Sequence, residues 1–381
     1  MKIGIDASRA FVSQPTGTER YAYEMTTRML RLPEAAKYEW ILYTKRNISN
    51  KSQITKEIQI IKKRNPGLNV DVVEIGLPYL WTQIGLAYRT WVDGLDRLWV
   101  PAHTLPVLRK PGLVTVVTIH GIEYEWLPAY ENLLQRWYLP LSTVYAVKHA
   151  TRVIAVSKFT RDQLVERLKA MKAKIEVIGE GYELKTAGNE QVTSAHVMQE
   201  YGLRPKKYLL FVGTVQPRKN LVRLIQAYAK VSEKHQDLKL VICGKLGWNY
   251  SEVLEAVKKV DGGKIVITGY ADVSKMEALL SASLLYVQPS ITEGFGLPVL
   301  EAMDRGIPVA SSNGGALPEV IGDAGVLFDP FSVEGMAIAI ERILGDRELR
   351  EGIVVAGKKQ VKKFQWTISA GKVLKLLTYN I

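Results

Sequence analysis

Two adjacent cations stand where an apolar strand should give way to a helix. Arg218 and Lys219 follow the apolar segment that ends at Gly213, and Asn220 after them can cap a helix. A diphosphate placed there would be held by both side chains and by the partial positive charge of the helix terminus. An Arg-Lys pair in a loop can also simply face solvent, so this pair needs support from elsewhere in the chain.

A second charged stretch, Glu293-Gly-Phe-Gly-Leu-Pro-Val-Leu-Glu301, follows another apolar segment. Gly294 and Gly296 let backbone amides approach a ligand, and Pro298 suits the first turn of a helix that leaves Glu301 near its start. Carboxylate oxygens accept hydrogen bonds from vicinal hydroxyls, so Glu293 and Glu301 suit ribose and a hexose. The structural alternative is a glycine-rich turn before a helix with a stabilising N-terminal Glu.

His120 occupies an informative position among the five histidines. It follows the apolar run 114–119 and precedes Gly121, so it lies at the carboxyl end of a strand, where parallel α/β sheets place ligands. A lone histidine is more often structural. The other histidines receive no role, although His103 could line a cleft.

Short apolar segments alternate with amphipathic ones along the chain, which predicts an α/β fold with parallel sheets. Strands are expected in a first series at 2–6, 39–44, 70–75, 97–100, 114–119, 152–156 and 175–178. A second series is expected at 208–213, 239–243, 264–268, 284–288, 307–310 and 325–328. We therefore expect an N-terminal domain at 1–186 and a C-terminal domain at 187–363, joined by a polar linker near residue 187, with an amphipathic helix at 364–381.

The composition fits an ordered globular protein with two cores. The chain has 381 residues, of which 47% are hydrophobic and 23% charged, and its length favours two domains. The single cysteine, Cys243, lies in an apolar run and is expected to be a buried structural thiol. With no signal-peptide pattern at the start and no apolar run long enough to span a bilayer, a cytoplasmic location is expected.

The formal net charge of +13 lies mostly in the first half of the chain. The segment 45–64 is strongly basic: Lys45, Arg46, Lys51, Lys56, Lys62, Lys63 and Arg64 are opposed only by Glu57. It could attract an anionic membrane, giving peripheral contact at the inner membrane surface, or an anionic acceptor, or it could be an ordinary solvated surface. No nucleic-acid recognition motif accompanies the charge, so nucleic acid is not an expected partner.

Taken together, these motifs resemble glycosyltransferase family four, the retaining enzymes with the two-domain GT-B fold. The resemblance covers nearly the whole chain and is closest to its mannosyl-transferring branch, through Ile119-His-Gly-Ile-Glu-Tyr-Glu-Trp-Leu-Pro128. The other motifs that carry it are Asp6 with Thr16-Gly17-Thr18, Val156-Ser-Lys-Phe-Thr-Arg161, Gly213-Thr-Val-Gln-Pro-Arg-Lys-Asn220, Glu293 with Glu301, and Ser311-Ser-Asn-Gly-Gly-Ala-Leu-Pro-Glu319.

The resemblance implies a role for each motif residue. Two Rossmann-like domains would face each other across a cleft, with the C-terminal helix crossing back to the first domain. Arg218 and Lys219 would hold the donor diphosphate, and Glu301 the ribose. Glu293 would hold the transferred sugar. The further implied donor contacts are the amides of Gly294, Phe295, Gly296 and Leu297, then Gly269 and Tyr270 near the base, and Gly17 facing the diphosphate. His120 would lie near the sugar as a catalytic residue together with Glu293.

The implied reaction is transfer of a hexose with retention of anomeric configuration. The sequence has no Asp-x-Asp motif after a strand and no His/Cys cluster with ligand spacing, so neither metal nor cofactor is expected. GDP-mannose is the favoured donor, with a UDP-sugar as the alternative, and the acceptor would be a glycan or a lipid-linked molecule in polysaccharide biosynthesis. The other functions considered are a sugar-nucleotide epimerase of the same fold and a catalytically silent nucleotide-sugar-binding protein.

Overall fold

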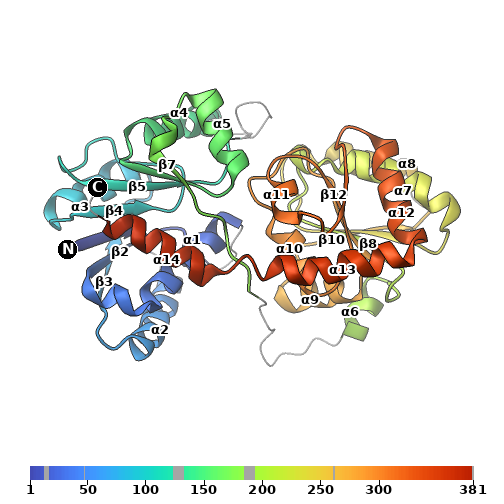
Figure 1. The fold of residues 1–381 in the computed structure, drawn as a ribbon, viewed down its shortest axis with the longest axis horizontal. Helices are drawn as coiled ribbons and strands as arrows, with labels where there is room; N and C mark the ends of the chain where they lie inside the picture. Colours follow the sequence, from blue (N-terminus) through green and yellow to red (C-terminus); the bar gives the residue numbers. More distant parts are fainter. Residues whose placement is uncertain (13–16, 47, 123–132, 184–193, 261, 380–381) are drawn as a thin grey trace. The chain divides into compact units, whose positions relative to one another are not determined.

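The computed structural model describes residues 1–12, 17–46, 48–122, 133–183, 194–260 and 262–379. They divide into two compact units (Figure 1). Unit 1 comprises the described residues of 1–125, 132–181 and 365–379. Unit 2 comprises those of 182–364. The predicted domain boundary at 186/187 lies outside the described residues.

Each unit is built on one parallel sheet with helices around it. In the described part of unit 1, seven strands run in the order β3-β2-β1-β4-β5-β6-β7. Their bounds are β1 Lys2–Asp6, β2 Glu39–Lys45, β3 Asn69–Ile75, β4 Arg97–Val100, β5 Val114–Ile119, β6 Arg152–Ala155 and β7 Ile175–Val177. All the pairings in this sheet are parallel, for example Ile3 of β1 opposite Trp40 of β2.

The described part of unit 2 contains a six-stranded parallel sheet in the order β10-β9-β8-β11-β12-β13. The bounds are β8 Tyr208–Val212, β9 Lys239–Cys243, β10 Ile265–Gly269, β11 Leu285–Gln288, β12 Val309–Ser312 and β13 Val326–Phe328. In both units all the predicted strands are present, with ends within two residues of the expected positions. The prediction of two Rossmann-like α/β folds is therefore confirmed.

The helices begin and end at recognisable signals. Ser157, Asp272, Ser332 and Asp346 each accept a backbone N–H with their side chain at a helix start. The helices of unit 1 are α1 Gly17–Arg31, η1 Pro33–Lys37, α2 Ile48–Arg64, η2 Trp81–Leu86, α3 Ala87–Val92, α4 Leu133–His149, α5 Lys158–Leu168, η4 Lys172–Lys174 and α14 Trp366–Thr378. Those of unit 2 are α6 Ser194–Glu200, η5 Pro217–Lys219, α7 Leu221–Lys234, α8 Ser251–Val260, α9 Val273–Ala282, α10 Leu297–Asp304, α11 Leu317–Ile321, α12 Val333–Gly345 and α13 Arg347–Val361.

The cores consist of the apolar faces that the sequence pattern predicts. Leu221, Leu224, Ile225 and Tyr228 of α7 are buried in the core of unit 2. Cys243 is buried at the end of β9, and burial raises the pKa of its thiol, so the prediction of a structural thiol is confirmed. Within the described residues, no helix combines the length and hydropathy needed to cross a membrane.

The last helix, α14, packs on unit 1 although it follows unit 2 in the chain. Figure 1 shows α14, in red, beside α1, in blue. Its first residue, Trp366, is buried and meets the ring of Tyr21 edge-on, with ring centroids 6.1 Å apart. A Cβ on Gly181 would lie 2.1 Å from the Trp366 nitrogen, so only glycine fits where the first chain segment leaves unit 1 beside the returning one. The predicted crossing of the C-terminal helix is confirmed.

Trp366→Ala is expected to destabilise unit 1 by about 3–5 kcal/mol, because it empties a buried site beside Tyr21. The matched control is Ile368→Ala on the same helix, whose half-exposed side chain should change stability by less than about 1 kcal/mol. Hydrogen exchange of the α1 amides measures the effect. Equal protection of α1 in both variants would contradict this account of the packing.

Candidate functional site

The carboxyl edge of the unit 2 sheet gathers most of the predicted donor residues. Gly269 ends β10, and its carbonyl accepts the N–H of Gly244, which follows β9, at 2.9 Å. A Cβ on Gly244 would lie 2.1 Å from the carbonyl oxygen of Gly213, the residue after β8. Glu293 follows the next strand, β11. Neighbouring parallel strands thus bring these backbone segments into one row, the position where such sheets bind ligands.

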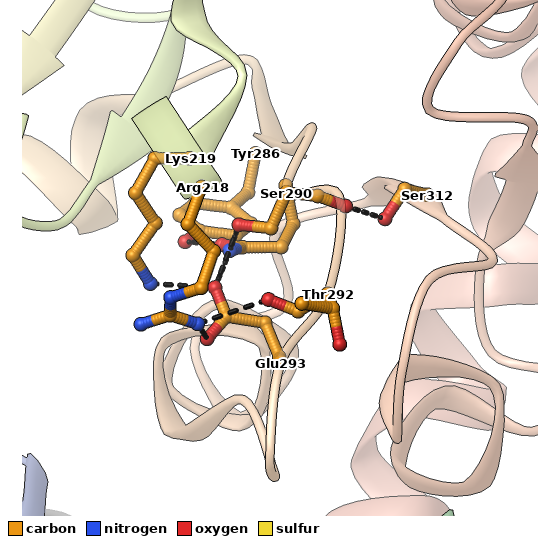
Figure 2. Close-up of polar contacts among 8 residues, drawn as sticks. Arg218, Lys219, Tyr286, Ser290, Thr292, Glu293 and Ser312 are labelled. Atoms are coloured by element: carbon orange, nitrogen blue, oxygen red, sulfur yellow. Dashed lines mark hydrogen bonds and ion pairs between the residues drawn. The ribbon is translucent and has the colours of Figure 1, made fainter. Parts of the chain in front are cut away.

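Arg218, Lys219 and Glu293 form a charged triad at this edge. Arg218 Nη1 donates to Glu293 Oε2 and Lys219 Nζ to Glu293 Oε1, each at 2.5 Å. Figure 2 shows the three side chains converging, with the two cations on one side of the carboxylate. Two positive charges against one negative charge leave the triad net positive, which suits an anionic ligand.

Beneath the triad lies a buried hydrogen-bond network that the sequence reading missed. Glu293 Oε1 also accepts from Ser290 Oγ at 2.6 Å and from Gln288 Nε2 at 2.9 Å. The Tyr286 hydroxyl donates to Gln288 Oε1 at 2.6 Å. The signal was available, since polar groups at 286, 288 and 290 alternate along a buried strand and its extension and therefore point to one face. Four donors to one carboxylate, counting the two cations, hold it in a single orientation.

The loop 289–293 that carries Glu293 is fixed through its backbone. Ser312 Oγ donates to the Ser290 carbonyl at 2.5 Å (Figure 2), and the Ala316 amide donates to the Glu293 carbonyl at 2.8 Å. The Ile291 amide donates to the carbonyl of Arg218 at 2.9 Å. The cation loop and the carboxylate loop are thus bonded to each other by main chain as well as by side chain, a preorganised arrangement.

Asn220 corrects one prediction from the sequence. It immediately precedes α7, but its side chain makes no capping hydrogen bond to that helix. Instead its backbone adopts the left-handed region, with φ 59°, and its Nδ2 donates to the carbonyls of Pro289, at 3.0 Å, and Pro330, at 2.6 Å. Left-handed backbone favours asparagine among non-glycine residues. Asn220 therefore ties the cation loop to the loop after β11 rather than capping a helix.

The motif around Gly314 and Gly315 serves the same loop. A Cβ on Gly314 would lie 2.2 Å from the Ile291 carbonyl oxygen, and one on Gly315 would lie 2.4 Å from the Glu293 carbonyl oxygen. Larger residues would push the Glu293 loop away, because contacts this short require the backbone to move. The glycine pair after β12 is thus required by close backbone packing.

The electrostatics of the triad favour a charged Glu293. Burial by itself raises the pKa of this carboxyl, but the charges of Arg218 and Lys219, with hydrogen bonds from Lys219 and Ser290, outweigh burial and lower the pKa from 4.5 to about 2. A group whose pKa is lower in the folded state stabilises the fold above its unfolded pKa and loses that contribution as the pH falls.

Glu293→Gln is therefore expected to weaken the acid dependence of stability. The wild-type free energy of unfolding should fall more steeply than that of the variant as the pH drops from about 4.5 to about 2, because only the wild type takes up a proton at this position. Urea unfolding at successive pH values measures both slopes. Glu252→Gln, at an exposed position of α8, is the control and should keep the wild-type slope. Equal slopes for all three proteins would rule out an ionised Glu293 in the fold.

The remaining predicted residues of the second motif surround the start of α10. Gly294 and Phe295 form a bend, and Gly296 precedes the helix with φ 112°, a conformation that favours glycine. Leu297 is the first helical residue, and Pro298 lies in the first turn as predicted. Glu301 is on the same helix and half-buried. The ring of Phe295 packs edge-on against Phe364, with centroids 5.6 Å apart.

Gly269 and Tyr270 are at the far end of the same sheet edge. Gly269 has φ 69°, and a Cβ there would have open space around it. The Tyr270 ring is about half-exposed, and Lys245 Nζ lies 4.9 Å from its centroid. An exposed aromatic ring beside a cation can stack on a planar base.

In unit 1, both ring nitrogens of His120 are engaged. Nε2 lies 2.8 Å from the carbonyl oxygen of Pro101, which can only accept, so Nε2 carries a hydrogen. Nδ1 lies 3.4 Å from Glu180 Oε1, and the Tyr21 ring meets the imidazole edge-on at 4.6 Å. These contacts with Pro101, Glu180 and Tyr21 fix the orientation of the imidazole ring. Glu180 was not singled out from the sequence.

A second histidine lies beside this group. The ring centroid of His103 is 5.7 Å from that of His120, so the two imidazoles are neighbours in unit 1. Burial and the neighbouring His120 and Arg9 lower the pKa of His103 to about 3, which keeps it neutral near neutral pH. Its backbone has φ 38°, an uncommon conformation for histidine.

Gly17, the predicted residue facing the diphosphate, is exposed and is the first residue of α1. A Cβ there would meet nothing within 4 Å, so packing does not demand glycine. Thr16 of the same motif lies outside the described residues. In the parts of the chain that the structure describes, no group of three His, Cys, Asp or Glu residues could hold a metal ion.

Comparison with solved structures identifies the fold class. Sucrose-phosphate synthase from Thermosynechococcus elongatus superposes with a TM-score of 0.74 and 18% identity, covering 99% of this chain and 98% of that one. The Anabaena protein Alr3699/HepE in complex with UDP and glucose superposes with a TM-score of 0.73 and 17% identity, covering 99% of both chains. The two Rossmann-like units thus define a protein of the GT-B class.

Sequence comparison then gives the family. Residues 15–186 match the model of Glycosyltransferase Family 4, and residues 196–360 match that of Glycosyl transferases group 1. The O-antigen chain mannosyltransferase B of Escherichia coli is 32% identical over 267 residues, covering 68% of this chain and 70% of that protein. The chain belongs to glycosyltransferase family four, and it is a glycosyltransferase with mannosyltransferase relatives. This membership favours transfer over the epimerase and the catalytically silent alternatives.

Proposed function

We propose that this protein transfers mannose from GDP-mannose to a hydroxyl of a glycan or lipid-linked acceptor, with retention of anomeric configuration and without a metal ion. The mannose assignment is supported by the mannosyltransferase relative at 32% identity. UDP-sugars remain the alternative donors, since the GT-B protein Alr3699/HepE binds UDP and glucose. A cytoplasmic location, a role in polysaccharide biosynthesis and peripheral membrane contact stay predictions.

The observation that carries the proposal is the direct contact of Arg218 and Lys219 with Glu293. A donor diphosphate would bind the two cations and replace the carboxylate as their partner. Glu293 would then be available to accept hydrogen bonds from hydroxyls of the sugar attached to that diphosphate. Adjacent sites for phosphate and sugar are what binding a sugar nucleotide requires.

The other residues take the roles that the family implies. Glu301 binds the ribose hydroxyls, Gly269 and Tyr270 lie near the base, and the amides of the 294–297 segment contact the sugar. Gly17 and His120 act from unit 1. The negative charge that develops on the leaving diphosphate would be stabilised by Arg218, Lys219 and helix-end amides, so the chemistry needs no metal to neutralise it. In this mechanism the acceptor hydroxyl attacks the face that the diphosphate leaves, and the leaving phosphate takes the hydroxyl proton.

A thermal-shift panel of nucleotide sugars tests the donor. GDP-mannose at about 100 times its dissociation constant should raise the unfolding free energy by about 2.7 kcal/mol, while UDP-glucose and free mannose raise it less. A larger shift with UDP-glucose would replace the donor assignment, and no shift with any sugar nucleotide would remove the proposed site.

Product analysis tests the reaction. Incubation with GDP-mannose and a mixture of mannosyl oligosaccharides and polyprenyl-linked glycans should give an extended acceptor carrying α-linked mannose. Activity should persist in excess EDTA. A β-linked product would contradict retention, and complete loss of activity in EDTA would contradict metal independence.

A further inference from the structure

Several neighbouring segments of unit 1 expose large apolar side chains. Six of them define what we term the aromatic surface: Tyr79, Leu80, Tyr88, Trp91, Leu108 and Trp137. They come from the segment before η2, from α3, from the 105–109 loop and from α4. Tyr79 is 84% exposed, Leu108 76% and Trp137 70%. Exposed apolar surface of this kind usually marks a binding site for a protein or a membrane.

Hydrogen bonds join these segments into one continuous surface. Gln83 of η2 donates to the Leu105 carbonyl at 3.2 Å and accepts from the Val107 amide at 3.0 Å. The same Gln83 Nε2 lies 3.4 Å from the Tyr138 hydroxyl of α4. Trp91 Nε1 of α3 donates to the Leu108 carbonyl at 3.2 Å. The segments that carry the exposed side chains are therefore bonded to one another rather than scattered over the unit.

The backbone at the centre of the surface is held in uncommon conformations. Leu80 has φ 52°, in the left-handed region that a branched apolar residue rarely adopts. The next six residues, Trp81–Leu86, form a π-helix, a geometry often found at functional sites. Such conformations cost free energy and persist where the surrounding structure imposes them. Here the result is that Tyr79 and Leu80 project into solvent.

The charge around the aromatic surface is positive. The sequence contains no Asp or Glu in 76–92, in 97–122 or in α4, Leu133–His149. The same stretches supply Arg109, Lys110 and Lys148, and also Arg89, whose charge is paired with Asp93 at 2.7 Å. Arg109 is bonded to the Tyr145 hydroxyl and the His149 carbonyl, so it joins the loop to α4. Tryptophan and tyrosine with nearby cations and few carboxylates match the interface of an anionic bilayer.

We propose that the aromatic surface docks unit 1 on an anionic lipid bilayer, with Tyr79, Leu108 and Trp137 inserted at the headgroup level. The docking would bring a lipid-linked acceptor to the enzyme. This role of the surface rests on the proposed function. The basic segment 45–64, for which membrane contact was one of three interpretations, is less suited. In α2 the side chains of Ile54, Ile58 and Ile61 are buried, so that helix offers cations but little apolar surface.

Vesicle sedimentation of the full chain tests the proposal. The wild type should bind vesicles that contain phosphatidylglycerol and bind pure phosphatidylcholine more weakly. The triple variant Tyr79→Ser/Leu108→Ser/Trp137→Ser should bind phosphatidylglycerol vesicles at least about 10-fold more weakly, because inserted aromatic and aliphatic area is lost. The matched control Ile338→Ser/Val355→Ser/Ile368→Ser changes side chains that are 66%, 56% and 50% exposed elsewhere and should bind like the wild type.

Three results would overturn the docking. The wild type could fail to bind phosphatidylglycerol vesicles, or the triple variant could bind as well as the wild type. Sedimentation velocity could instead show a dimer that the triple variant abolishes while vesicles go unbound, which would assign the surface to a second copy of the chain. Donor-induced thermal shifts keep the two proposals separate, because the triple variant changes none of the proposed donor residues and should give the same shifts as the wild type.

Discussion

Lys219→Ala is expected to lower kcat/KM for sugar transfer by at least about 100-fold, the usual consequence of removing one preorganised charge from a leaving group. Lys219 Nζ is one of two cations on Glu293 in the ligand-free site. Without it, Arg218 alone must neutralise the diphosphate. The variant should fold, since Glu293 keeps Arg218, Ser290 and Gln288 as hydrogen-bond donors.

The measurement is steady-state kinetics with GDP-mannose, paired with the donor-induced thermal shift. Lys219→Ala should lose most of that shift as well as activity. Lys230→Ala is the matched control, because Lys230 is an exposed lysine of the next helix, paired with Glu334. It should retain both readouts. Wild-type turnover in Lys219→Ala would refute the assignment of the diphosphate to this pair of cations.

His120→Ala is expected to reduce turnover by at least about 100-fold while leaving donor binding intact, because misplacing reacting groups by about 1 Å has an effect of that size. The imidazole ties the Pro101 carbonyl to Glu180, so its removal frees both from their positions. The donor residues of unit 2, Arg218, Lys219 and Glu293 among them, are untouched. A low kcat with a normal donor-induced thermal shift is thus the opposite pattern to that of Lys219→Ala.

Two further variants sharpen this experiment. His235→Ala removes a partly exposed histidine paired with Glu341 in unit 2 and should keep wild-type kcat. Glu180→Gln keeps a hydrogen-bonding group near His120 Nδ1 and should lose less activity than His120→Ala. Hydrogen exchange of β5 reports whether unit 1 remains folded. Normal kcat in a folded His120→Ala protein would remove His120 from the proposed machinery.

The strands could be predicted from the sequence because buried parallel strands appear as nearly continuous apolar runs. The run at 239–243 became β9 with the same bounds. The run at 307–310 became β12 at Val309–Ser312. Ile307 and Pro308 supply apolar character just before the strand, and the Pro308 carbonyl accepts the Tyr286 N–H at 3.0 Å. The π-helix at Trp81–Leu86 was not predicted, because one extra residue per turn leaves no periodicity that a short segment can display.

The charged members of the site were predictable, but the network that orients them was not recognised. Arg218, Lys219 and Glu293 are charged residues beside glycine and proline, a visible pattern. Gln288 and Ser290 lie at the end of an apolar strand and resemble ordinary polar residues at its edge. Their importance depends on Glu293 lying above them, which requires the three-dimensional path of the loop after β11. Asn220 was predicted to cap a helix. Its actual partners, the carbonyls of Pro289 and Pro330, are distant in sequence and could not be predicted from local pattern.

The return of α14 to unit 1 determines the order in which the protein can be assembled during synthesis. Every strand of the unit 2 sheet precedes Trp366 in the chain, so unit 2 can fold on the ribosome as soon as its own residues emerge. Unit 1 is made first, but the Trp366 ring, which packs against Tyr21, is added only after all of unit 2 has been translated. The nascent N-terminal half must therefore wait with an uncovered apolar face on α1, and chaperones that bind such faces should associate with it during that interval.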